Sequence, residues 1–455
     1  MMRKIKKHIG LIIILIIVIA FPTSLSNQTK INMRVIVTGI AVDKSGEEFE
    51  VTAQIIKPSV GSKTAGGGAS IDYVSDKGKT LSGAISKMAF KAGKASAFSH
   101  TNFIILGKDM LSEDVSESLD YFIRDKIIKN SALILFAEEK ASDEMKKTKN
   151  TDISAGMGLQ KVFLFKEHES DGLMVTTMEF LNNNHSLSKT ATVSVLSLKT
   201  NEESMGKSTN GSGDSSSSGG AGGSGSESSS SESSSQSSSS SSGSEGSGES
   251  SGSQGGSGES SGSSGSGSSG GSSGESQNQY FVSETPILMF VGGKYAGKLE
   301  THEEISGFMF ANKESKAIDV MVESSDDGRM KDAKIEVNIK NMGVKKCVKF
   351  ENDKPVLSVK VKVYNAEINE IICSDIVASL NEEEYQTMIE DLKKEIKTRV
   401  EACFEKAKSV NADIFDAYEQ AYRTHYKKTK KYQTMEDFLK ELELNVEIDV
   451  RKLDY

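Results

Sequence analysis

Residues 103–136, FIILGKDMLSEDVSESLDYFIRDKIIKNSALILF, decide how the first half of the chain folds. The segment opens with the apolar run Phe103–Leu106 and ends with a second, Ala132–Phe136, and each has the length of a buried strand. Between them, apolar side chains recur at the spacing of an amphipathic helix, at Val115, Leu119, Phe122 and Ile123. Strand, helix and strand in succession predict a mixed α/β arrangement in which helices cover a sheet.

The same alternation continues on both sides of this segment. The β-branched run Val35–Val42 and the alternating run Phe49–Ile56 flank a turn at Asp43–Gly46, which predicts a β-hairpin. An N-terminal mixed α/β domain is therefore predicted over residues 30–200. Its other elements are a loop over Pro58–Ser75, a helix over Thr80–Ala92 and a last strand over Val193–Leu198.

The C-terminal part of the chain favours strands first and helices afterwards. A middle β-rich region is predicted over residues 280–340, and a C-terminal α+β domain over residues 341–455. Asn381 and Glu384 match a capping box before a long helix over residues 381–410. The predicted strands are Ile287–Val291, Lys334–Ile339, Val344–Phe350, Val356–Tyr364 and the closing edge strand Asn445–Leu453, and the shorter helices are Asp413–Tyr426 and Met435–Leu442.

Residues 208–279 separate these regions and consist almost wholly of Ser and Gly with scattered Glu. Such a composition cannot bury enough apolar surface to offset the entropy of folding, so a disordered low-complexity linker is predicted. Two interpretations remain open. The linker is either a spacer that lets two halves move independently, or a tolerated loop insertion in one compact unit, because loop closure costs grow slowly with length.

The amino terminus predicts attachment to a membrane. Residues 1–8 carry four basic side chains and no acid, and residues 9–25 contain the apolar run Ile9–Phe21, interrupted only by Gly10. That run is shorter than the roughly 20 residues that span a bilayer, so it is an uncleaved membrane helix or a signal peptide. In both cases the basic tail stays cytoplasmic and the body of the protein is exported.

Composition excludes several classes of protein. The formal net charge is −9, with 55 Lys and Arg against 64 Asp and Glu, so a basic nucleic-acid binder is not expected. Three cysteines, Cys347, Cys373 and Cys403, exclude a disulfide-dense scaffold. They contain no Cys-x-x-Cys pair, and we expect Cys347 and Cys403 to pack as small apolar side chains.

Motifs that would carry chemistry are incomplete. Gly292 and Gly297-Lys298 have the spacing of a phosphate-binding loop, but Leu299 stands where a hydroxyl is needed, so we expect a hairpin turn. His302-Glu303 begins like a zinc-protease helix, but Ser306 occupies the second histidine position. We expect His100 to make a local hydrogen bond before a strand, and Arg124-Asp125 to form a structural pair at a helix end. No catalytic, cofactor-binding or metal-binding residue is predicted, and the binding residues are left open.

Taken together, several segments resemble the Ger(x)C family, the C subunits of bacterial spore germinant receptors. The resemblance covers nearly all of the chain outside the linker and the anchor. It rests on the order of Ile31-Asn32 with Val35–Lys44, Ser99–Gly107, Leu119–Asp125, Gly297-Lys298-Leu299 with Glu304 and Gly307, and Ala412–Phe415. It implies a multi-domain α/β ectodomain on the outer surface of the spore inner membrane, working with an integral A subunit and a transporter-like B subunit and without catalysis.

The chain departs from that family in two places. The family is usually lipidated at a Gly-Cys lipobox before the first domain, whereas no cysteine precedes Cys347 here. An uncleaved helix therefore becomes the expected anchor, and it holds a protein more firmly than one acyl chain does. The Ser/Gly linker is the second departure.

The sequence therefore predicts a non-enzymatic, membrane-anchored subunit of a nutrient germinant receptor, with mixed sheets flanked by helices. The expected partners are the membrane and the A-type and B-type subunits, with no cofactor and no nucleic acid. Two alternatives stay open. One is an exported cell-envelope binding or adhesion module, and the other is an exported hydrolase whose site forms only in three dimensions, for instance a cleft that gathers two acids and His100.

Overall fold

The computed structural model describes residues 34–57, 70–92, 95–124, 128–148, 157–168, 172–200, 280–282, 285–312, 317–373 and 380–455. The predicted basic tail 1–8, the predicted membrane segment 9–25 and the predicted linker 208–279 lie outside these residues. Within the described ranges, no helix is both long and apolar enough to cross a bilayer. The predicted mixed α+β class is confirmed, because the described residues form two large mixed sheets flanked by helices.

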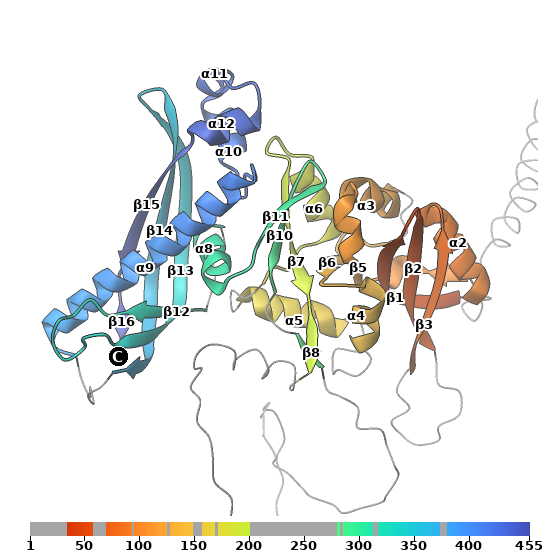
Figure 1. Ribbon diagram of the computed structural model, residues 1–455, viewed down its shortest axis with the longest axis horizontal. Helices are drawn as coiled ribbons and strands as arrows, with labels where there is room; N and C mark the ends of the chain where they lie inside the picture. Colours follow the sequence, from red (N-terminus) through yellow and green to blue (C-terminus); the bar gives the residue numbers. More distant parts are fainter. Residues whose placement is uncertain are drawn as a thin grey trace, which may run out of the picture. The chain divides into compact units, whose positions relative to one another are not determined.

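The first sheet has nine strands and contains a parallel centre (Figure 1). Strands β1 (Arg34–Ser45), β5 (Phe103–Leu106), β6 (Leu133–Ala137) and β7 (Thr190–Leu196) lie side by side and run in the same direction. Beyond β1, the antiparallel strands β2 (Glu48–Lys57) and β3 (Ser70–Gly78) extend the sheet, and the short strand β4 (Ala95–Ala97) pairs with the start of β1.

Helices cover both faces of this sheet, because its central strands are apolar on both sides. In β5, Ile104 and Leu106 belong to one buried cluster and Phe103 and Ile105 to the other, as the period of two in a strand requires. The helices α2 (Leu81–Ala92), α3 (Val115–Arg124) and α6 (Thr177–Asn184) contribute to the first cluster, and α4 (Ala141–Lys147) and α5 (Met157–His168) to the second. Figure 1 shows α3 and α6 on the side of the sheet opposite to α4 and α5.

The segment after the linker completes the first sheet. Strand β10 (Ile287–Val291) pairs antiparallel with β7, and β11 (Lys294–Leu299) pairs with β10 and forms the edge. The predicted middle region 280–340 is therefore divided between two sheets. The physical reason is that the backbone N–H and C=O groups on the outer side of β7 need a partner, and β10 supplies it.

A small two-stranded ladder lies where the chain leaves the first sheet and where it returns. Strand β8 (Leu198–Thr200) pairs antiparallel with β9 (Tyr280–Val282), so Thr200 and Tyr280 are directly opposite each other. Residues 201–279 thus begin and end at adjacent backbone positions. This arrangement favours the loop-insertion interpretation of the linker over the spacer interpretation.

The second sheet is built around one long hairpin. Strands β13 (Lys334–Glu351) and β14 (Lys354–Ile372) pair antiparallel along almost their whole length. On the outer sides, β12 (Ile318–Glu323) pairs with β13, while β15 (Glu443–Val450) and β16 (Leu453–Asp454) pair parallel with β14. The two strands predicted over Lys334–Ile339 and Val344–Phe350 are one strand, whose register shifts between Ile339 and Asn341 and again before Met342.

A 28-residue helix, α9 (Glu382–Ser409), packs on the apolar face of the second sheet. The predicted capping box is confirmed: Asn381 accepts from the Glu384 backbone N–H at 2.9 Å, and the Glu384 carboxylate accepts from the Asn381 N–H at 2.8 Å. Helix α8 (His302–Asn312) lies against α9, and α10 (Ala417–Thr424), α11 (Tyr426–Thr429) and α12 (Met435–Glu441) follow it. One buried cluster contains residues of both sheets, so the described parts on the two sides of the linker form a single unit.

The remaining predicted elements agree with the structure only in part. The hairpin β1–β2, the helices α2 and α3 and the strands β5 and β10 have their predicted positions within a few residues. The predicted loop 58–75 instead contains the start of strand β3. Helices α4, α5, α6 and α8 and strand β12 were not predicted, and the predicted helix Asp413–Tyr426 begins only at Ala417.

Candidate functional site

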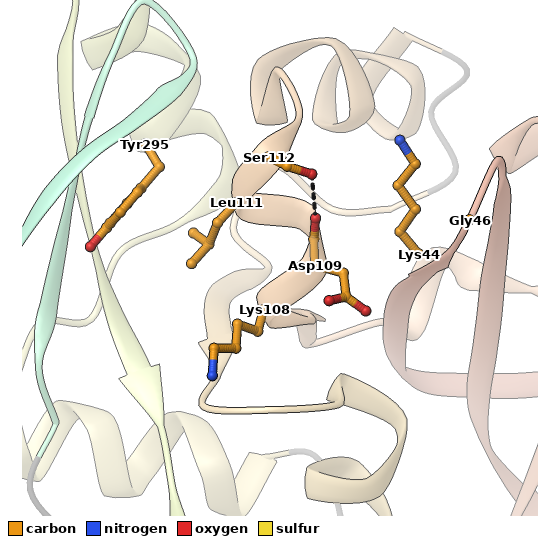
Figure 2. A pocket seen from close by; sticks show the side chains of 7 residues that line it. All are labelled: Lys44, Gly46, Lys108, Asp109, Leu111, Ser112 and Tyr295. Atoms are coloured by element: carbon orange, nitrogen blue, oxygen red, sulfur yellow. Dashed lines mark hydrogen bonds between the residues drawn. The ribbon is translucent and has the colours of Figure 1, made fainter.

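A crevice lies at the carboxyl ends of β1 and β5. The chain runs from β1 outward to β2 and β3, and then returns to build β5, β6 and β7 on the other side of β1. In open α/β sheets, ligands bind at such a reversal of strand order, outside the carboxyl ends of the strands. A cavity of 630 Å³ is present at this point, lined by Lys44, Gly46, Lys108, Asp109, Leu111, Ser112 and Tyr295 (Figure 2).

The lining residues come from three separate segments. Lys44 lies at the end of β1 and Gly46 in the β1–β2 turn, Asp109 and Leu111 belong to the 3-10 helix η3 (Lys108–Ser112), and Tyr295 belongs to β11. Figure 2 shows Leu111 on the side of η3 that faces Tyr295, and Lys44 on its opposite side. The Ser112 hydroxyl donates to the Asp109 carbonyl oxygen at 2.8 Å and closes η3. One side of the crevice, at Tyr295, therefore comes from a strand that follows the linker.

A buried carboxylate directly precedes Lys44, one of the lining residues. Asp43, only 1% exposed at the end of β1, accepts from the backbone N–H groups of Ala141 at 2.7 Å and Ser142 at 3.0 Å. The Asp43 side chain thereby caps the first turn of α4 from strand β1. The N-cap residue of α4 itself, Lys140, makes no side-chain hydrogen bond to that turn. Gly107 permits this approach, since a Cβ there would lie 2.3 Å from the Asp43 Oδ1. Asp43 and Gly107 both belong to segments that carried the family resemblance.

The cations at the crevice already have partners. Lys44 forms an ion pair with Glu113 and lies 6.0 Å from the centre of the Phe49 ring. Lys108 forms an exposed pair with Glu139 at 2.9 Å. The described lining residues contain a hydroxyl, a phenol, one carboxylate and two ammonium groups, and they contain no histidine or cysteine. The arrangement can hold a polar group by hydrogen bonds and ion pairs.

A second polar centre joins the first sheet to the loop after α9. Asp413, in the loop after α9, is buried and its carboxylate accepts from the Ser188 hydroxyl at 2.7 Å and from the N–H groups of Ala417 and Tyr418, each at 2.8 Å. Its own N–H donates to the Thr190 Oγ1 at 3.1 Å. Burial raises the pKa of Asp413, although these hydrogen bonds favour the carboxylate. Ser188 and Thr190 lie at the start of β7, so these bonds connect the first sheet to the loop after α9.

A lysine extends this polar centre. The Lys346 ammonium donates to the Asn312 side-chain oxygen at 2.5 Å and to the Phe415 carbonyl oxygen at 3.0 Å, and lies 3.9 Å from the Asp416 carboxylate. Burial lowers the pKa of Lys346, and the nearby Asp416 carboxylate partly offsets this shift. Strand β13, helix α8 and the start of α10 are thus held together at one point.

Close packing of α8 against α9 explains two more residues of the resemblance. A Cβ on Gly307 would lie 2.2 Å from the Arg399 carbonyl oxygen, so glycine is required there. The Arg399 guanidinium is buried, with Nε 2.8 Å from the Glu395 carboxylate and one terminal nitrogen 3.0 Å from the Ser306 hydroxyl. Glu304 accepts from the Glu300 N–H at 2.8 Å and helps to cap α8. These residues have structural roles in the helix pair.

The structure places the other sequence candidates apart from both polar centres. Gly292 and Gly293 form the β10–β11 turn with positive φ angles of 58° and 79°, which confirms the predicted hairpin. His302 lies exposed at the start of α8, 3.1 Å from the Asp319 carbonyl oxygen. His100 is exposed in the 3-10 helix η2 (Phe98–His100) and lines none of the cavities described here. Arg124 pairs with Asp120 at 3.4 Å, and Asp125 lies outside the described residues.

The cysteines follow the prediction in one case and depart from it in another. Cys403 is buried on α9, and burial raises the pKa of its thiol. Cys347 is exposed, because the register of β13 turns it to the wet face of the second sheet. The described ranges hold no cluster of three or more His, Cys, Asp or Glu residues that could bind a metal ion.

Sequence reasoning missed Ser188 and Lys346. Ser188 sits in a short loop without a recognisable motif, and Lys346 is one of several lysines on an alternating strand. Only their contacts with the loop after α9 distinguish them from other polar surface residues. Asp413, by contrast, was part of the segment Ala412–Phe415 that resembled the Ger(x)C family.

Comparison with known proteins gives three findings. Residues 27–198 match the family model described as spore germination protein N-terminal domain, and residues 287–452 match the one described as spore germination B3/GerAC like, C-terminal. YfkR of Bacillus subtilis (strain 168), a protein named for spore germination, is 29% identical over 154 residues, which are 32% of this chain and 39% of YfkR. The crystal structure of the GerBC protein aligns with a TM-score of 0.45 and 13% identity, over 91% of this chain and 96% of GerBC.

Proposed function

This chain belongs to the spore germination GerAC family, and we propose that it is the C subunit of a nutrient germinant receptor that takes part in spore germination. The observation that carries the proposal is the paired match of an N-terminal and a C-terminal family model on the two sides of the linker. The two matched regions lie in one compact unit in which β10 completes the first sheet, so the insertion leaves the family's fold whole.

The proposed mechanism is assembly without catalysis. The subunit is held by its N-terminal segment at the outer face of the spore inner membrane, and its surface docks on the integral A-type and B-type subunits. The polar centre around Asp413 and Lys346 supports this role. Its hydrogen bonds connect the first sheet to the loop after α9, and connect that loop to strand β13 of the second sheet. The two cavity-lining lysines at the β1–β5 crevice are paired, which fits a binding surface better than a reaction centre.

Germination of spores that lack the gene tests the proposal. Loss of refractility is followed after addition of nutrients and, separately, after a stimulus that bypasses the receptors. We expect failure with nutrients, germination with the bypass stimulus, and recovery when the wild-type gene is restored. Normal germination by both routes, in a strain without other C-type subunits, contradicts the proposed function.

Recovery of partners tests the mechanism separately. An affinity tag at the carboxyl terminus of the full chain, in membranes solubilised with mild detergent, is expected to retain the A-type and B-type subunits. The matched control is a strain that carries the tag on an unrelated spore membrane protein. Recovery of this chain alone, from spores that need it to germinate, contradicts the assembly mechanism and leaves the role in germination standing.

A further inference from the structure

Helix α5 has two large apolar side chains on its outer side. Leu164 is 54% exposed and Phe165 is 63% exposed, whereas Leu159 and Phe163 on the inner side are buried against the first sheet. Beside Leu164 lies a cavity of 430 Å³, lined by Ser131, Leu133, Gln160, Lys161, Leu164, Met174 and Thr176. We call Leu164, Phe165 and this cavity the α5 patch. Leu159 and Phe163 pack into the core, so Leu164 and Phe165 on the outer side are available to a partner.

The α5 patch lies at the N-terminal ends of the parallel strands of the first sheet. Gln160 donates from Nε2 to the carbonyl oxygen of Asn102, the residue directly before β5, at 2.9 Å. Leu133, the first residue of β6, lines the cavity. Strand β1 runs parallel to β5, so Arg34, the first residue of β1, lies at this same end of the sheet.

A short stretch of chain separates the start of β1 from the predicted membrane segment. The apolar run ends at Phe21 and β1 begins at Arg34. The intervening stretch 22–33 reaches about 40 Å when fully extended, at roughly 3.3–3.6 Å per residue. A tether of this length keeps the start of β1 near the bilayer surface and makes a second contact with that surface intramolecular, so even a weak patch is engaged.

Two lysines near the cavity of the α5 patch suit an anionic lipid surface. Lys161 lines the cavity and is exposed. Lys129 is also exposed and lies at the same end of the strands, with its ammonium 3.3 Å from the Asn102 side-chain oxygen. No acidic residue is among the described residues that line the cavity. Exposed Leu and Phe side chains beside lysines are typical of helices that lie at the boundary between headgroups and acyl chains.

From these observations we propose that the α5 patch rests on the anionic surface of the membrane that anchors the chain. The first sheet then faces the bilayer with the end at which β1, β5 and β6 begin. The inference rests on the membrane attachment in the proposed function and deepens it, since it names the face of the protein that meets the lipid. It also leaves the crevice at the opposite ends of β1 and β5 away from the lipid.

Depth-dependent fluorescence quenching tests the contact in the full chain. The chain is reconstituted into vesicles of phosphatidylcholine and phosphatidylglycerol that contain nitroxide-labelled lipid. An environment-sensitive dye is placed at F165C in a background where Cys347 and Cys373 are serine. The matched control is M321C on β12, where Met321 is 43% exposed on the second sheet.

We expect nitroxide lipid to quench the dye at position 165 several-fold more strongly than the dye at position 321. Equal quenching at both positions, or none at position 165, overturns the inference. Shielding of position 165 from aqueous iodide without quenching by nitroxide lipid also overturns it, because a protein surface then covers the patch. A second variant, L164S/F165S with the dye at K161C, is expected to lose at least about threefold of the quenching, since two apolar side chains no longer enter the interface.

Flotation of the same vesicles separates this inference from the proposed function. If the full chain does not float with the vesicles, the membrane attachment in the proposed function fails. If the chain floats and position 165 is not quenched, the attachment stands and the α5 contact alone is refuted.

Discussion

Removal of the Ser/Gly insertion is expected to leave the fold intact and to stabilise it. Deletion of residues 206–277 takes away the 72 residues that form the second unit of the chain and leaves seven residues to connect Thr200 to Tyr280. Those two residues are directly opposite each other in the β8–β9 ladder, so a seven-residue connection can close it. The deletion should therefore act through the entropy of the unfolded chain.

The magnitude follows from the lengths of the two loops. The cost of closing a flexible loop grows as three halves of RT times the logarithm of its length. Shortening the connection from residues 201–279 to seven residues lowers this cost by about 2 kcal/mol. The free energy of unfolding should rise by that amount, and the midpoint of thermal unfolding by about 3 °C.

Denaturant unfolding of the purified full chain and of the deletion variant, both in the same detergent, measures this change. A variant whose insertion is scrambled at constant length and composition is the matched control, and it should unfold like the wild type. A deletion variant that is less stable, or whose two halves unfold in separate steps, refutes the loop-insertion reasoning. Normal germination with the deletion variant is expected, and a slowed response would show that the insertion acts in signalling.

Further predictions concern the polar centre, the cap of α9 and the contact between α8 and α9. Asp413→Ala leaves the Ser188 hydroxyl and the N–H groups of Ala417 and Tyr418 without their acceptor, and should lower the free energy of unfolding by about 2–4 kcal/mol. Denaturant unfolding measures this change, and unchanged stability would contradict the reasoning. The Arg329 guanidinium holds the pKa of Glu384 below its ordinary value, so the stability advantage of the wild type over Glu384→Gln should be present at neutral pH. That advantage should disappear as the pH falls below about 4, and an advantage independent of pH contradicts the reasoning. Gly307→Ala forces a Cβ against a backbone carbonyl and should cost about 1–3 kcal/mol. Gly83→Ala in the first turn of α2, where the added Cβ would meet only the Thr80 hydroxyl oxygen at 3.1 Å, should cost less, and equal effects would contradict this.

Local patterns predicted the strands and helices whose own side chains define them. The run Phe103–Leu106 is apolar at every position, so it reads as a buried strand whatever surrounds it. Asn381 and Glu384 cap α9 through bonds that span only three residues. Helix α5 was missed because its outer side carries Leu164 and Phe165 as well as its inner side carrying Phe163, which removes the contrast between an apolar and a polar face.

The candidate sites were less predictable, because they depend on residues that are distant in the chain. Asp43 caps a helix that starts 98 residues later, and Ser188 bonds to an aspartate 225 residues later. Neither side chain differs in its local sequence from an ordinary turn or loop residue. Their roles follow from long-range pairing of strands, which a hydrophobic period does not encode.

The sequence by itself determined the family, the mixed α+β class, the position of the insertion and the expectation of a membrane anchor. These properties are local, since composition, period and capping residues act over a few turns or strands. Tertiary structure alone decided that β10 and β11 complete the first sheet, that the insertion starts and ends on adjacent strands, and that Asp413 connects the first sheet to the loop after α9. The physical reason is that an open strand edge and a buried carboxylate must both find hydrogen-bond partners, and those partners lie far away in the chain.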